Sequence, residues 1–280
     1  MTIPKVAIVI LNWNGLADTN ECLESLKEIT YPGYQVILVD NGSDGDDARV
    51  LRDTFGDYIH VIENDRNYGF AEGCNIGIRY ALAHMEPEYV LLLNNDTVVA
   101  PDFLDELVSV AEADPRIGIL GPKIYYYDFH GRKDVIWAAG GKVRWWHPWV
   151  YDGIGTNERD APRYNRLGSV DWVSGSAMMI KRGTVETLSY LDPRYFFGNE
   201  DVEYCIRARK RGLKVVYVPT ARVWHKVGKS RKKRGPRFSD LPPYYRLLRR
   251  NFSAMAYAYH LLLLPLLLFH RGIFWMIRRW

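Results

Sequence analysis

Short apolar runs alternate with amphipathic helical patterns through the first hundred residues. Runs rich in valine, isoleucine and leucine predict buried β-strands at Val6–Leu11, Gln35–Val39, Tyr58–Ile62 and Tyr89–Leu93. Apolar residues at helical spacing, in the last case after an opening proline, predict helices at Leu16–Ile29, Ala71–Ala83 and Pro101–Ala113. Alternation of this kind is typical of a parallel α/β sheet whose faces are covered by helices.

The pattern changes in the second half of the chain. Residues 117–180 are rich in glycine, tryptophan and tyrosine, which predicts an irregular region with much β-structure. A helix closed by a glycine is expected over Asn199–Arg211, followed by a short strand over Val215–Val218. We therefore expect one domain over residues 1–225 and a tail of different composition over residues 226–280.

The tail joins a basic stretch to an apolar one. Lys226–Arg237 contains seven basic residues and no acidic residue, whereas Phe252–Phe269 reaches the lower length limit of a membrane span. Arginines and aromatic residues flank the apolar stretch, which is typical of a helix lying in a membrane interface. A membrane span and a helix packed on the protein's own core are the alternatives. We expect peripheral membrane contact through residues 226–280.

The charge of the chain indicates phosphate-bearing partners. The net charge is +4, and most of the basic excess lies in the tail. The basic stretch suits anionic lipid head groups, or a lid that closes over a bound diphosphate. Nucleic acid is not expected as a partner, because no aromatic-interleaved binding module accompanies the basic residues.

The chain has three cysteines, Cys22, Cys74 and Cys205, without CxxC spacing. Neither a disulfide framework nor a thiolate zinc site is therefore expected. Cys22 and Cys205 lie in apolar helical patterns and are predicted to fill the core. The apolar run near the start is too short for a signal peptide and reads as a strand. A reducing, cytoplasmic setting is expected.

Polar residues gather where three predicted strands end, in Asn12-Trp13-Asn14-Gly15, Asp40-Asn41-Gly42-Ser43 and Asn94-Asn95-Asp96-Thr97. Ligands of parallel α/β sheets bind beyond the carboxyl ends of the strands, so these residues are candidate ligand contacts. The first turn has a single glycine, and neither the dinucleotide-binding pattern nor the P-loop pattern occurs. Amides and carboxylates suit a base and a ribose, while a metal or basic side chains would neutralise a diphosphate.

Taken together and in order, several segments carry a family resemblance: Val9–Gly15, Val39–Ser43, Asn67–Gly77, Leu91–Thr97, Phe196–Glu203 and Trp224–Gly228. Over residues 1–225 the chain resembles a family-2 glycosyltransferase with the GT-A fold, and it is most similar to the rhamnosyltransferase-like branch. The resemblance implies a Rossmann-like, mostly parallel α/β sheet flanked by helices. It also implies a nucleotide-sugar-binding half (1–100) and an acceptor half (101–225), ahead of a membrane-associating helical tail.

The resemblance assigns the donor nucleotide to the ends of the first strands. The donor contacts that it implies are Asn12, Asn14, Asp40, Asn67, Gly69, Asn75, Asn95 and Asp96. Asp40 would accept a hydrogen bond from the imide edge of uracil or thymine, and a turn-forming role is the alternative. The helix predicted over Ala71–Ala83 would present its N-terminus to the nucleotide or sugar. Alternatively, its glycines only allow close helix–strand packing.

Asn94-Asn95-Asp96 stands where the family has its DxD motif, and Asn94 departs from that motif. Asp96 alone would then hold Mn²⁺ or Mg²⁺, which accept one carboxylate together with phosphate oxygens and water. His225 resembles the histidine that completes the metal site, and imidazole suits manganese better than magnesium. The alternatives are a helix-capping role for Asp96 and a structural role for His225.

By resemblance, Glu200 and Asp201 supply the acid–base chemistry. An acceptor hydroxyl must lose a proton to attack an anomeric carbon, and a carboxylate can take that proton. Asp201 is the predicted base, and Glu200 is predicted to orient the acceptor. Acidic residues also suit the first turn of a helix because of its dipole, and Asn199 suits a helix cap.

The segment Asp171–Ala177 resembles the one that lies beside the donor sugar and the acceptor. Its predicted acceptor contacts are Trp172, Ser174 and Gly175. The ring of Trp172 would stack on a sugar face, or it would fill the core instead.

These features predict an inverting, metal-dependent glycosyltransferase. It would move a hexose or deoxyhexose from a UDP- or dTDP-sugar to a glycan or lipid-linked acceptor at the cytoplasmic membrane face. The alternative is a catalytically inactive sugar-nucleotide-binding or scaffolding protein of the same fold, which the missing carboxylate at Asn94 keeps open.

Overall fold

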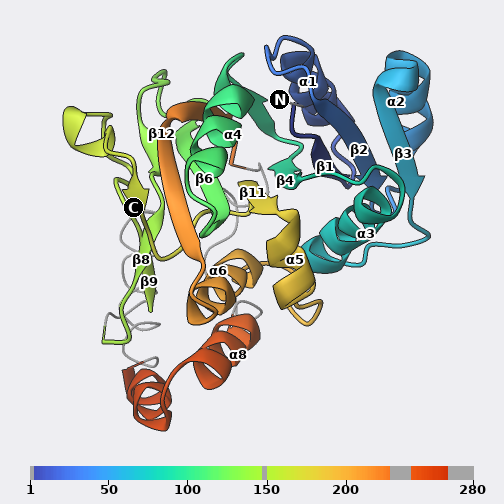
Figure 1. Cartoon of the computed structure of the whole chain (residues 1–280). Helices are drawn as coiled ribbons and strands as arrows, with labels where there is room; N and C mark the ends of the chain where they lie inside the picture. The colour runs from blue at the N-terminus through green and yellow to red at the C-terminus, as the bar shows by residue number, and fades with distance from the viewer. Residues whose placement is uncertain (1–2, 147–149, 228–240, 264–280) are drawn as a thin grey trace, which may run out of the picture.

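A computed structural model describes residues 3–146, 150–227 and 241–263, and a large sheet forms its centre (Figure 1). The strands of this sheet are β1 (Val6–Asn12), β2 (Tyr34–Asp40), β3 (Ile59–Glu63), β4 (Tyr89–Asn94), β5 (Thr97–Val99), β6 (Ile117–Tyr126), β7 (Ile136–Ala138), β10 (Gly168–Ser169), β11 (Ala177–Lys181) and β12 (Lys214–His225). They lie in the order β10-β12-β6-β11-β4-β1-β2-β3, with β5 paired to β12 and β7 to β6. Two further strands, β8 (Gly141–Val143) and β9 (Tyr151–Gly153), form a separate antiparallel pair.

The first half of the sheet is parallel, as predicted. Strands β3, β2, β1 and β4 lie side by side in the same direction, and each runs one residue past its predicted end onto a polar residue. The register pairs Asn12 with Asp40 and Leu11 with Asn94. The polar strand ends therefore share one edge of the sheet.

The second half of the sheet mixes directions. β11 lies antiparallel between β4 and β6, and β12 runs parallel to β6. The region over residues 117–180 is rich in β-structure, as expected. β12 is much longer than the predicted strand Val215–Val218. The prediction stopped at Val218 because Pro219 and a register shift between Val218 and Arg222 interrupt the apolar pattern of the strand.

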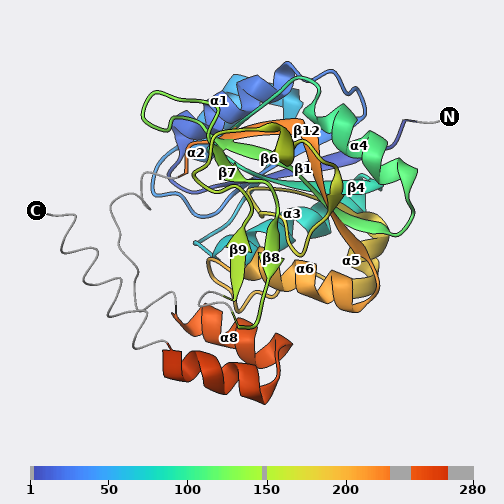
Figure 2. The same cartoon turned by 90° about the vertical axis from the view of Figure 1, so that its left-hand side faces the viewer.

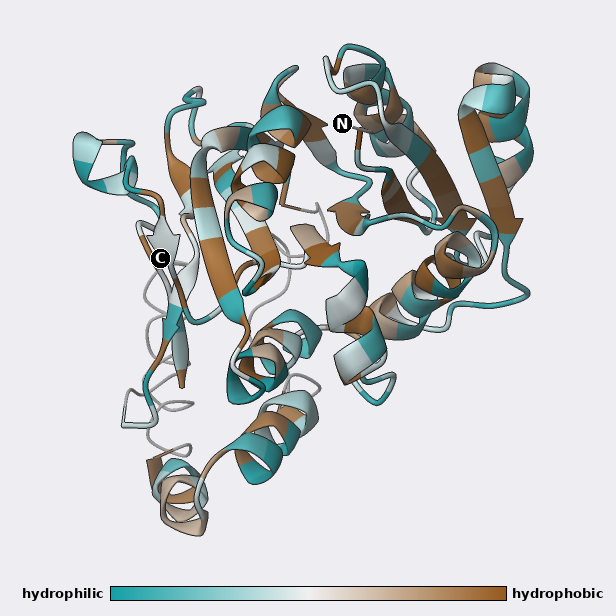
Figure 3. Ribbon diagram, viewed as in Figure 1, coloured by the Kyte–Doolittle hydropathy of each residue, from teal (hydrophilic) through white to brown (hydrophobic). Residues whose placement is uncertain are grey.

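Helices cover both faces of the sheet, and in chain order they are α1 (Leu16–Lys27), α2 (Asp47–Phe55), α3 (Phe70–His84), α4 (Phe103–Ala113), α5 (Arg182–Leu188) and α6 (Glu200–Lys210). A further helix, α8 (Leu241–Asn251), packs on α6. Figure 2 shows α1, α2 and α4 on one side of the sheet and α3, α5 and α6 on the other. Ile8 and Ile10 of β1 pack in the first of these layers, while Ala7 and Val9 pack in the second. Figure 3 shows the resulting pattern, with apolar strands between helices that have one apolar side.

Close packing explains several small residues. A Cβ atom at Gly73 would lie 2.5 Å from Leu11 Cδ1, and one at Gly77 would lie 2.4 Å from Val9 Cγ1. The packing alternative therefore holds for these two glycines, which let α3 approach β1. Cys22 and Cys205 lie in the core as predicted, and Cys74 is buried as well.

The tail packs beneath α6 through α8 and a second helix over residues 254–263 (Figures 1 and 2). His260 joins the tail to the domain through Nε2, which lies 2.8 Å from the Trp145 carbonyl oxygen. Its Nδ1 lies 3.0 Å from the hydroxyl of Tyr244 in α8. No helix within the described residues has the length and apolar character needed to cross a membrane. Most of Lys226–Arg237 and the end of Phe252–Phe269 lie outside the described residues.

Candidate active site

Asn12, at the end of β1, is the centre of a buried polar network. Its Nδ2 lies 2.7 Å from Asp40 Oδ1 and 3.0 Å from Asp47 Oδ2. Its Oδ1 accepts a hydrogen bond of 2.8 Å from the Thr19 hydroxyl. Because the side chain is fully buried, Asn12 holds its neighbours in position, and its direct contact with a donor stays a prediction.

Asp40 ends β2 in a tight turn with Ser43. Its Oδ1 accepts from the Ser43 hydroxyl at 2.6 Å, and its Oδ2 accepts from the Ser43 backbone N–H at 3.0 Å. The turn-forming alternative is therefore realised. A carboxylate offers about four acceptor positions, so the turn and a contact with a base are compatible. The base contact stays a prediction.

Asn14 links the loops that follow β1 and β2. Its Nδ2 donates to Asp44 Oδ2 at 2.9 Å, and its Oδ1 accepts from the Asp44 backbone N–H at 2.8 Å. Its φ of +51° lies in the left-handed region, which asparagine tolerates better than most residues. Asn14 is exposed at the rim of the strand ends, where its predicted donor contact is untested.

Asn41, next to Asp40, fixes the loop that follows β3. Its Nδ2 donates to Asn67 Oδ1 at 3.0 Å and to the Gly69 carbonyl oxygen at 3.2 Å. Asn67 Oδ1 also accepts from the Gly69 N–H at 2.8 Å. The Asn67 oxygen is thus used within the loop, and its amide nitrogen is the group that suits the predicted donor contact.

Gly69 brings this loop against the segment that precedes α6. Its φ is +83°, and a Cβ atom there would lie 2.6 Å from the Phe196 carbonyl oxygen. The Phe70 backbone N–H, in the first turn of α3, donates to the same oxygen at 2.7 Å. The predicted donor loop and the segment that carries the predicted base are therefore neighbours.

Asn75 lies inside the interface between α3 and the segment before α6. Its Nδ2 donates to the Leu191 carbonyl oxygen at 2.9 Å, and its Oδ1 accepts from the Leu191 N–H at 3.0 Å. The side chain is 1% exposed. Both ends of the amide are thus engaged by one backbone residue, and the donor contact predicted for Asn75 stays untested.

Asp96 and His225 meet although they are far apart in the sequence. β5 pairs with the end of β12 so that Thr97 lies opposite His225. Asp96 Oδ1 is then 2.9 Å from His225 Nε2, and the two side chains are only 14% and 8% exposed. The His225 ring is held edge-on against Trp137, with ring centroids 4.9 Å apart.

The spacing of this pair is that of a direct hydrogen bond, and it is also compatible with two ligands of one divalent metal. Donor atoms on neighbouring corners of an octahedral shell with bonds of about 2.1 Å are about 3 Å apart, which matches the separation of Asp96 Oδ1 and His225 Nε2. The described residues contain no cluster of three or more metal-ligating side chains. A metal at this pair would therefore depend on phosphate oxygens and water for the rest of its shell.

Asn94 and Asn95 flank the pair in different ways. Asn94 Nδ2 lies 3.4 Å from His225 Nε2, and Asn94 Oδ1 is buried without a hydrogen-bond partner among the described residues. Asn95 Nδ2 donates to the Thr19 hydroxyl at 2.9 Å and so joins the Asn12 network. The residue that departs from the DxD motif thus faces the Asp96–His225 pair, whereas Asn95 turns toward β1 and α1.

Cys22 lies close to this site without being a candidate ligand. Its Sγ is 3.7 Å from the Thr97 hydroxyl. Burial raises the pKa of the Cys22 thiol to about 12. The thiol is therefore protonated near neutral pH, and a metal ligand would have to be the thiolate.

Glu200 and Asp201 form the first turn of α6. Asp201 Oδ2 accepts from the Gly175 N–H at 2.9 Å, and Asp201 Oδ1 accepts from the Val202 N–H at 2.7 Å. Asn199 precedes the helix in a left-handed conformation without capping it through its side chain, and its Oδ1 accepts from the Tyr151 hydroxyl instead. These bonds fix the orientation of Asp201 beside Gly175, while Glu200 is buried next to it.

The predicted acceptor residues fall into two groups. Gly175 faces Asp201 and the ring of Phe70, since a Cβ atom on Gly175 would lie 3.3 Å from Asp201 Cβ. Ser174 is buried, with its hydroxyl 3.0 Å from that of Ser176. Trp172 is 8% exposed and its ring lies against the backbone of Gly141, so it fills the core. A sugar-stacking role for Trp172 stays untested.

Lys226, which the sequence placed in the segment Trp224–Gly228 and in the basic stretch, makes contacts next to Asp96 that the sequence did not indicate. Its Nζ lies 2.5 Å from Asp18 Oδ1 and 2.6 Å from Glu21 Oε2, and its backbone N–H donates to the Asp96 carbonyl oxygen at 2.9 Å. Burial works against its charge, but the hydrogen bonds to Asp18 and Glu21 raise the pKa of Lys226 overall. The sequence signal for this contact was the spacing of Asp18 and Glu21, three residues apart on one side of α1. That spacing points to Lys226 only when the end of β12 is known to lie next to α1.

Several known proteins are similar to this chain in sequence. A family model described as glycosyltransferase-like family 2 matches residues 4–239. A low-salt glycan biosynthesis hexosyltransferase of Haloferax volcanii is 26% identical over 76% of this chain, which spans 64% of that relative. An N-acetylglucosaminyl-diphospho-decaprenol L-rhamnosyltransferase of Mycobacterium tuberculosis is 29% identical over 72% of this chain and 70% of its own length. A dTDP-rhamnosyl transferase of Shigella flexneri is 27% identical over 88% and 81%.

Solved structures show the same fold. GalNAc-T7 with UDP, GalNAc and Mn²⁺ superimposes with a TM-score of 0.66 at 20% identity, over 80% of this chain and 44% of that one. A mannosyltransferase of Pyrobaculum calidifontis in complex with GDP-Man and Mn²⁺ gives a TM-score of 0.59 at 18% identity, over 89% and 69%. The predicted GT-A fold is thereby confirmed. Since the family model covers most of the sequence, the chain belongs to glycosyltransferase-like family 2.

Proposed function

We propose that the chain transfers a hexose or deoxyhexose from a UDP- or dTDP-sugar to a glycan or lipid-linked acceptor, with inversion at the anomeric carbon. The observation that carries the proposal is the meeting of Asp96 and His225, 2.9 Å apart, at the edge where the polar strand ends gather. The names of two relatives support the proposed substrate classes: the mycobacterial relative is named for a diphospho-decaprenol acceptor, and the Shigella relative for a dTDP-rhamnosyl donor.

In the proposed donor site, Asp40 accepts a hydrogen bond from the base, and Asn12 keeps that carboxylate in place. Asp96 and His225 hold Mn²⁺ or Mg²⁺. When bound, the metal neutralises charge on the diphosphate and so stabilises the leaving group. Support for this arrangement comes from the network around Asn12, which joins Asp40 through Thr19 to Asn95 beside the metal pair.

In the proposed transfer step, Asp201 takes the proton of the acceptor hydroxyl. The acceptor oxygen forms a bond to the anomeric carbon, and the bond from that carbon to the diphosphate oxygen breaks. Its electron pair leaves with the nucleoside diphosphate. The N–H groups of Gly175 and Val202 keep the Asp201 carboxylate oriented, and Glu200 lies beside it to orient the acceptor.

We place this activity at the cytoplasmic membrane face, with peripheral contact through residues 226–280. Apolar side chains on the second tail helix (residues 254–263) support this: Met255, Leu261 and Leu262 are 68%, 46% and 78% exposed. Trp145 and Trp146, in the loop that His260 ties to the tail, are 42% and 57% exposed.

A donor screen tests the proposed function. Purified full-length chain would be incubated with a panel of UDP- and dTDP-sugars, and the released nucleotide would be measured with manganese and with a chelator. We expect metal-dependent release from at least one donor, and loss of that release in Asp96→Ala. A chain that binds nucleotide sugars but releases no nucleotide from any of them would instead be the inactive, sugar-nucleotide-binding protein.

A further inference from the structure

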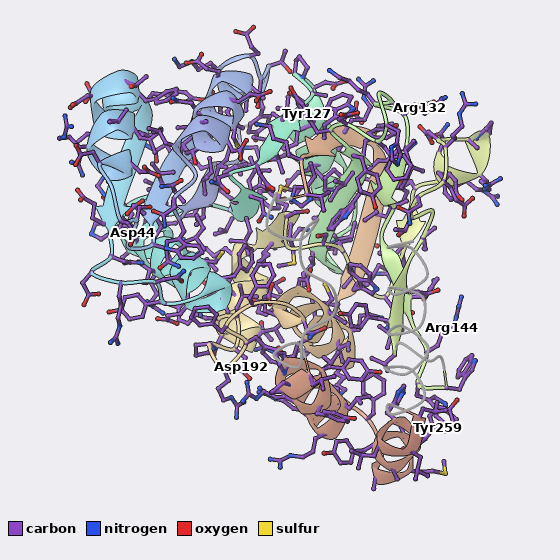
Figure 4. All side chains as sticks on the ribbon, turned by 180° about the vertical axis from the view of Figure 1, so that it is seen from behind. Asp44, Tyr127, Arg132, Arg144, Asp192 and Tyr259 are labelled. Atoms are coloured by element: carbon purple, nitrogen blue, oxygen red, sulfur yellow. The ribbon has the colours of Figure 1, made fainter. Side chains whose placement is uncertain are left out.

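A basic pocket lies between the segment that leads into α6 and the tail helix α8. Its volume is about 520 Å³, and four arginines and two tyrosines line it: Arg194, Arg246, Arg249, Arg250, Tyr245 and Tyr257. The arginines of α8 are spaced three and four residues apart, which places them on one side of the helix. Figure 4 labels Asp192, which lies at this side of the molecule next to α8.

Positive charge exceeds negative charge in this pocket. Asp192 Oδ2 lies 2.7 Å from Arg194 Nη2 and also binds Arg250. Arg250 Nε is 3.8 Å from Glu203 Oε1. Arg246 and Arg249 have no ion pair with a carboxylate anywhere in the described part of the chain. The charges of these two guanidinium groups are thus not neutralised by a carboxylate of the described residues, which suits an anionic ligand.

The pocket is held in shape before any ligand arrives. Arg246 donates to the Arg194 carbonyl oxygen, and its guanidinium lies 5.7 Å from the centre of the Tyr195 ring. The rings of Tyr245 and Tyr257 meet edge to face, 6.0 Å apart, and form a wall. Planar guanidinium forks fixed in this way suit the oxygens of a phosphate ester.

The pocket is connected to the predicted catalytic pair through a short segment of chain. Arg194 lies in the pocket, and the same segment reaches Glu200 and Asp201 at the start of α6. Between them, Phe196 and Phe197 are 57% and 61% exposed. A ligand with its anionic group among the arginines would therefore have apolar side chains beside it and the Asp201 carboxylate farther along.

We propose that this arginine pocket binds the diphosphate of a lipid-linked acceptor and so sets the acceptor sugar at Asp201. The proposal rests on the transferase function proposed above and narrows its acceptor class. A neutral glycan has no charge to offer these arginines. The pocket therefore favours acceptors that carry a diphosphate over glycans that lack one.

Direct binding of a short lipid diphosphate tests the pocket. Full-length chain would be titrated with farnesyl diphosphate, and with farnesol as the uncharged probe, in a calorimeter. We expect the Arg246→Ala/Arg249→Ala double variant to bind farnesyl diphosphate at least about tenfold more weakly, because two charge-assisted forks are lost. Arg249→Lys should give an intermediate loss, since lysine keeps the charge without the fork. Equal affinity of the wild-type chain and the double variant would overturn the proposal.

The matched control is Arg211→Ala, an exposed arginine at the end of α6 outside the pocket, which should leave the affinity unchanged. Thermal unfolding of each variant checks that the fold is intact. Vesicles of phosphatidylglycerol separate the two sources of phosphate. If the double variant loses vesicle binding but keeps its affinity for farnesyl diphosphate, the pocket binds membrane head groups and the proposal is wrong.

Nucleotide release from the donor, measured on the same samples, separates this proposal from the proposed function. Arginine-dependent binding of farnesyl diphosphate without any nucleotide release would support the pocket proposal and refute the proposed transferase function. Nucleotide release together with equal farnesyl diphosphate affinity in the wild-type chain and the double variant would refute the pocket proposal and leave the transferase function supported.

Discussion

At the scale of single residues, hydrogen bonds from the backbone decide what a carboxylate can do. Asp201 has one oxygen on the Gly175 N–H and the other on the Val202 N–H, so both oxygens act as acceptors and the carboxylate has a fixed direction. A carboxylate held in this way remains able to receive a proton. Asn at the same position could accept at one oxygen only and could not take a proton.

We therefore expect Asp201→Asn to reduce sugar transfer by about 10²–10⁴-fold, the range that general-base catalysis usually contributes. Nucleotide affinity should stay unchanged, because Asp201 lies apart from the predicted base-binding turn. Transfer rates and UDP or dTDP titrations measure the two effects. Asp57→Asn, at an exposed carboxylate just before β3 and outside the predicted donor loop, serves as the control, and sustained turnover in Asp201→Asn would refute the role.

The residue scale also shows where sequence reasoning reached its limit. The residue types and strand ends of Asn12, Asp40 and Asp96 were predictable, because an apolar strand followed by polar residues has a clear pattern. The contacts of Asn75 with Leu191 and of Lys226 with Asp18 were not. Each depends on which distant segment packs there, and a single sequence does not state that.

At the scale of elements, close approach between α3 and β1 positions the donor loop. Gly77 lies where a Cβ atom would come 2.4 Å from Val9 Cγ1, whereas nothing lies within 4 Å of a Cβ atom at Gly183 in α5. These two helical glycines differ in their surroundings and share their backbone preference, so they form a matched pair.

Gly77→Ala should lower the free energy of unfolding, since overpacking costs about 1–3 kcal/mol and the gain in helix propensity is at most about 1 kcal/mol. Gly183→Ala has the propensity gain without the clash and should be neutral or stabilising. Chemical unfolding of both variants measures the difference. A Gly77→Ala chain as stable as Gly183→Ala would mean that α3 can shift away from β1 at no cost.

The contact between the tail and the domain should depend on pH through Asp192. Burial opposes its charge, but hydrogen bonds from Arg194 and the charge of Arg250 lower the pKa of Asp192 below its ordinary value. A lowered folded-state pKa gives stability that is complete above the unfolded-state pKa of about 3.9 and is lost as the pH falls through the folded-state pKa.

Asp192→Asn should therefore reduce the melting temperature at pH 7, and the gap to the wild-type chain should close as the pH falls below about 4. Thermal unfolding of both chains over a pH series measures it. A gap that is constant over the whole series would show that the charge of Asp192 contributes nothing to the packing of α8.

The element scale explains the remaining differences between expectation and structure. The parallel strands were predictable because buried strands of this kind are continuous apolar runs. α2 was missed because it is short and contributes only Ala48, Leu51 and Phe55 to the core. The length of β12 was not predictable because Pro219 and the register shift interrupt its apolar pattern. The pairing of its end with β5, which brings His225 to Asp96, was therefore not predictable either.

At the scale of the whole molecule, the tail adds an apolar and basic surface to the GT-A fold. α8 is anchored by buried Leu247 and Leu248, while Met255, Leu261 and Leu262 on the next helix face outward. Figure 2 shows the two described tail helices together at one end of the molecule. The buried leucines that anchor α8 and the exposed apolar side chains of the next helix therefore lie on different surfaces of the tail.

Full-length chain should sediment with anionic vesicles, and a chain ended after Val227 should stay in the supernatant. Because that truncation also removes the buried leucines of α8, a Met255→Ser/Leu261→Ser/Leu262→Ser variant provides the fold-preserving test and should bind vesicles more weakly. Val50→Ser, at a half-buried position of α2, is the control. Equal sedimentation of the truncated and full-length chains would end the anchoring hypothesis.

The pairing of β5 with β12 also sets an order of events during synthesis. Asp96 leaves the ribosome early, whereas His225 belongs to the last strand of the sheet. A growing chain that has not yet exposed this strand has the carboxylate but no imidazole beside it. Contacts between such distant residues form late because the closing of a long loop costs entropy. Until β12 has docked, a nascent chain presents the Asp96 carboxylate of the proposed metal pair without the imidazole of His225.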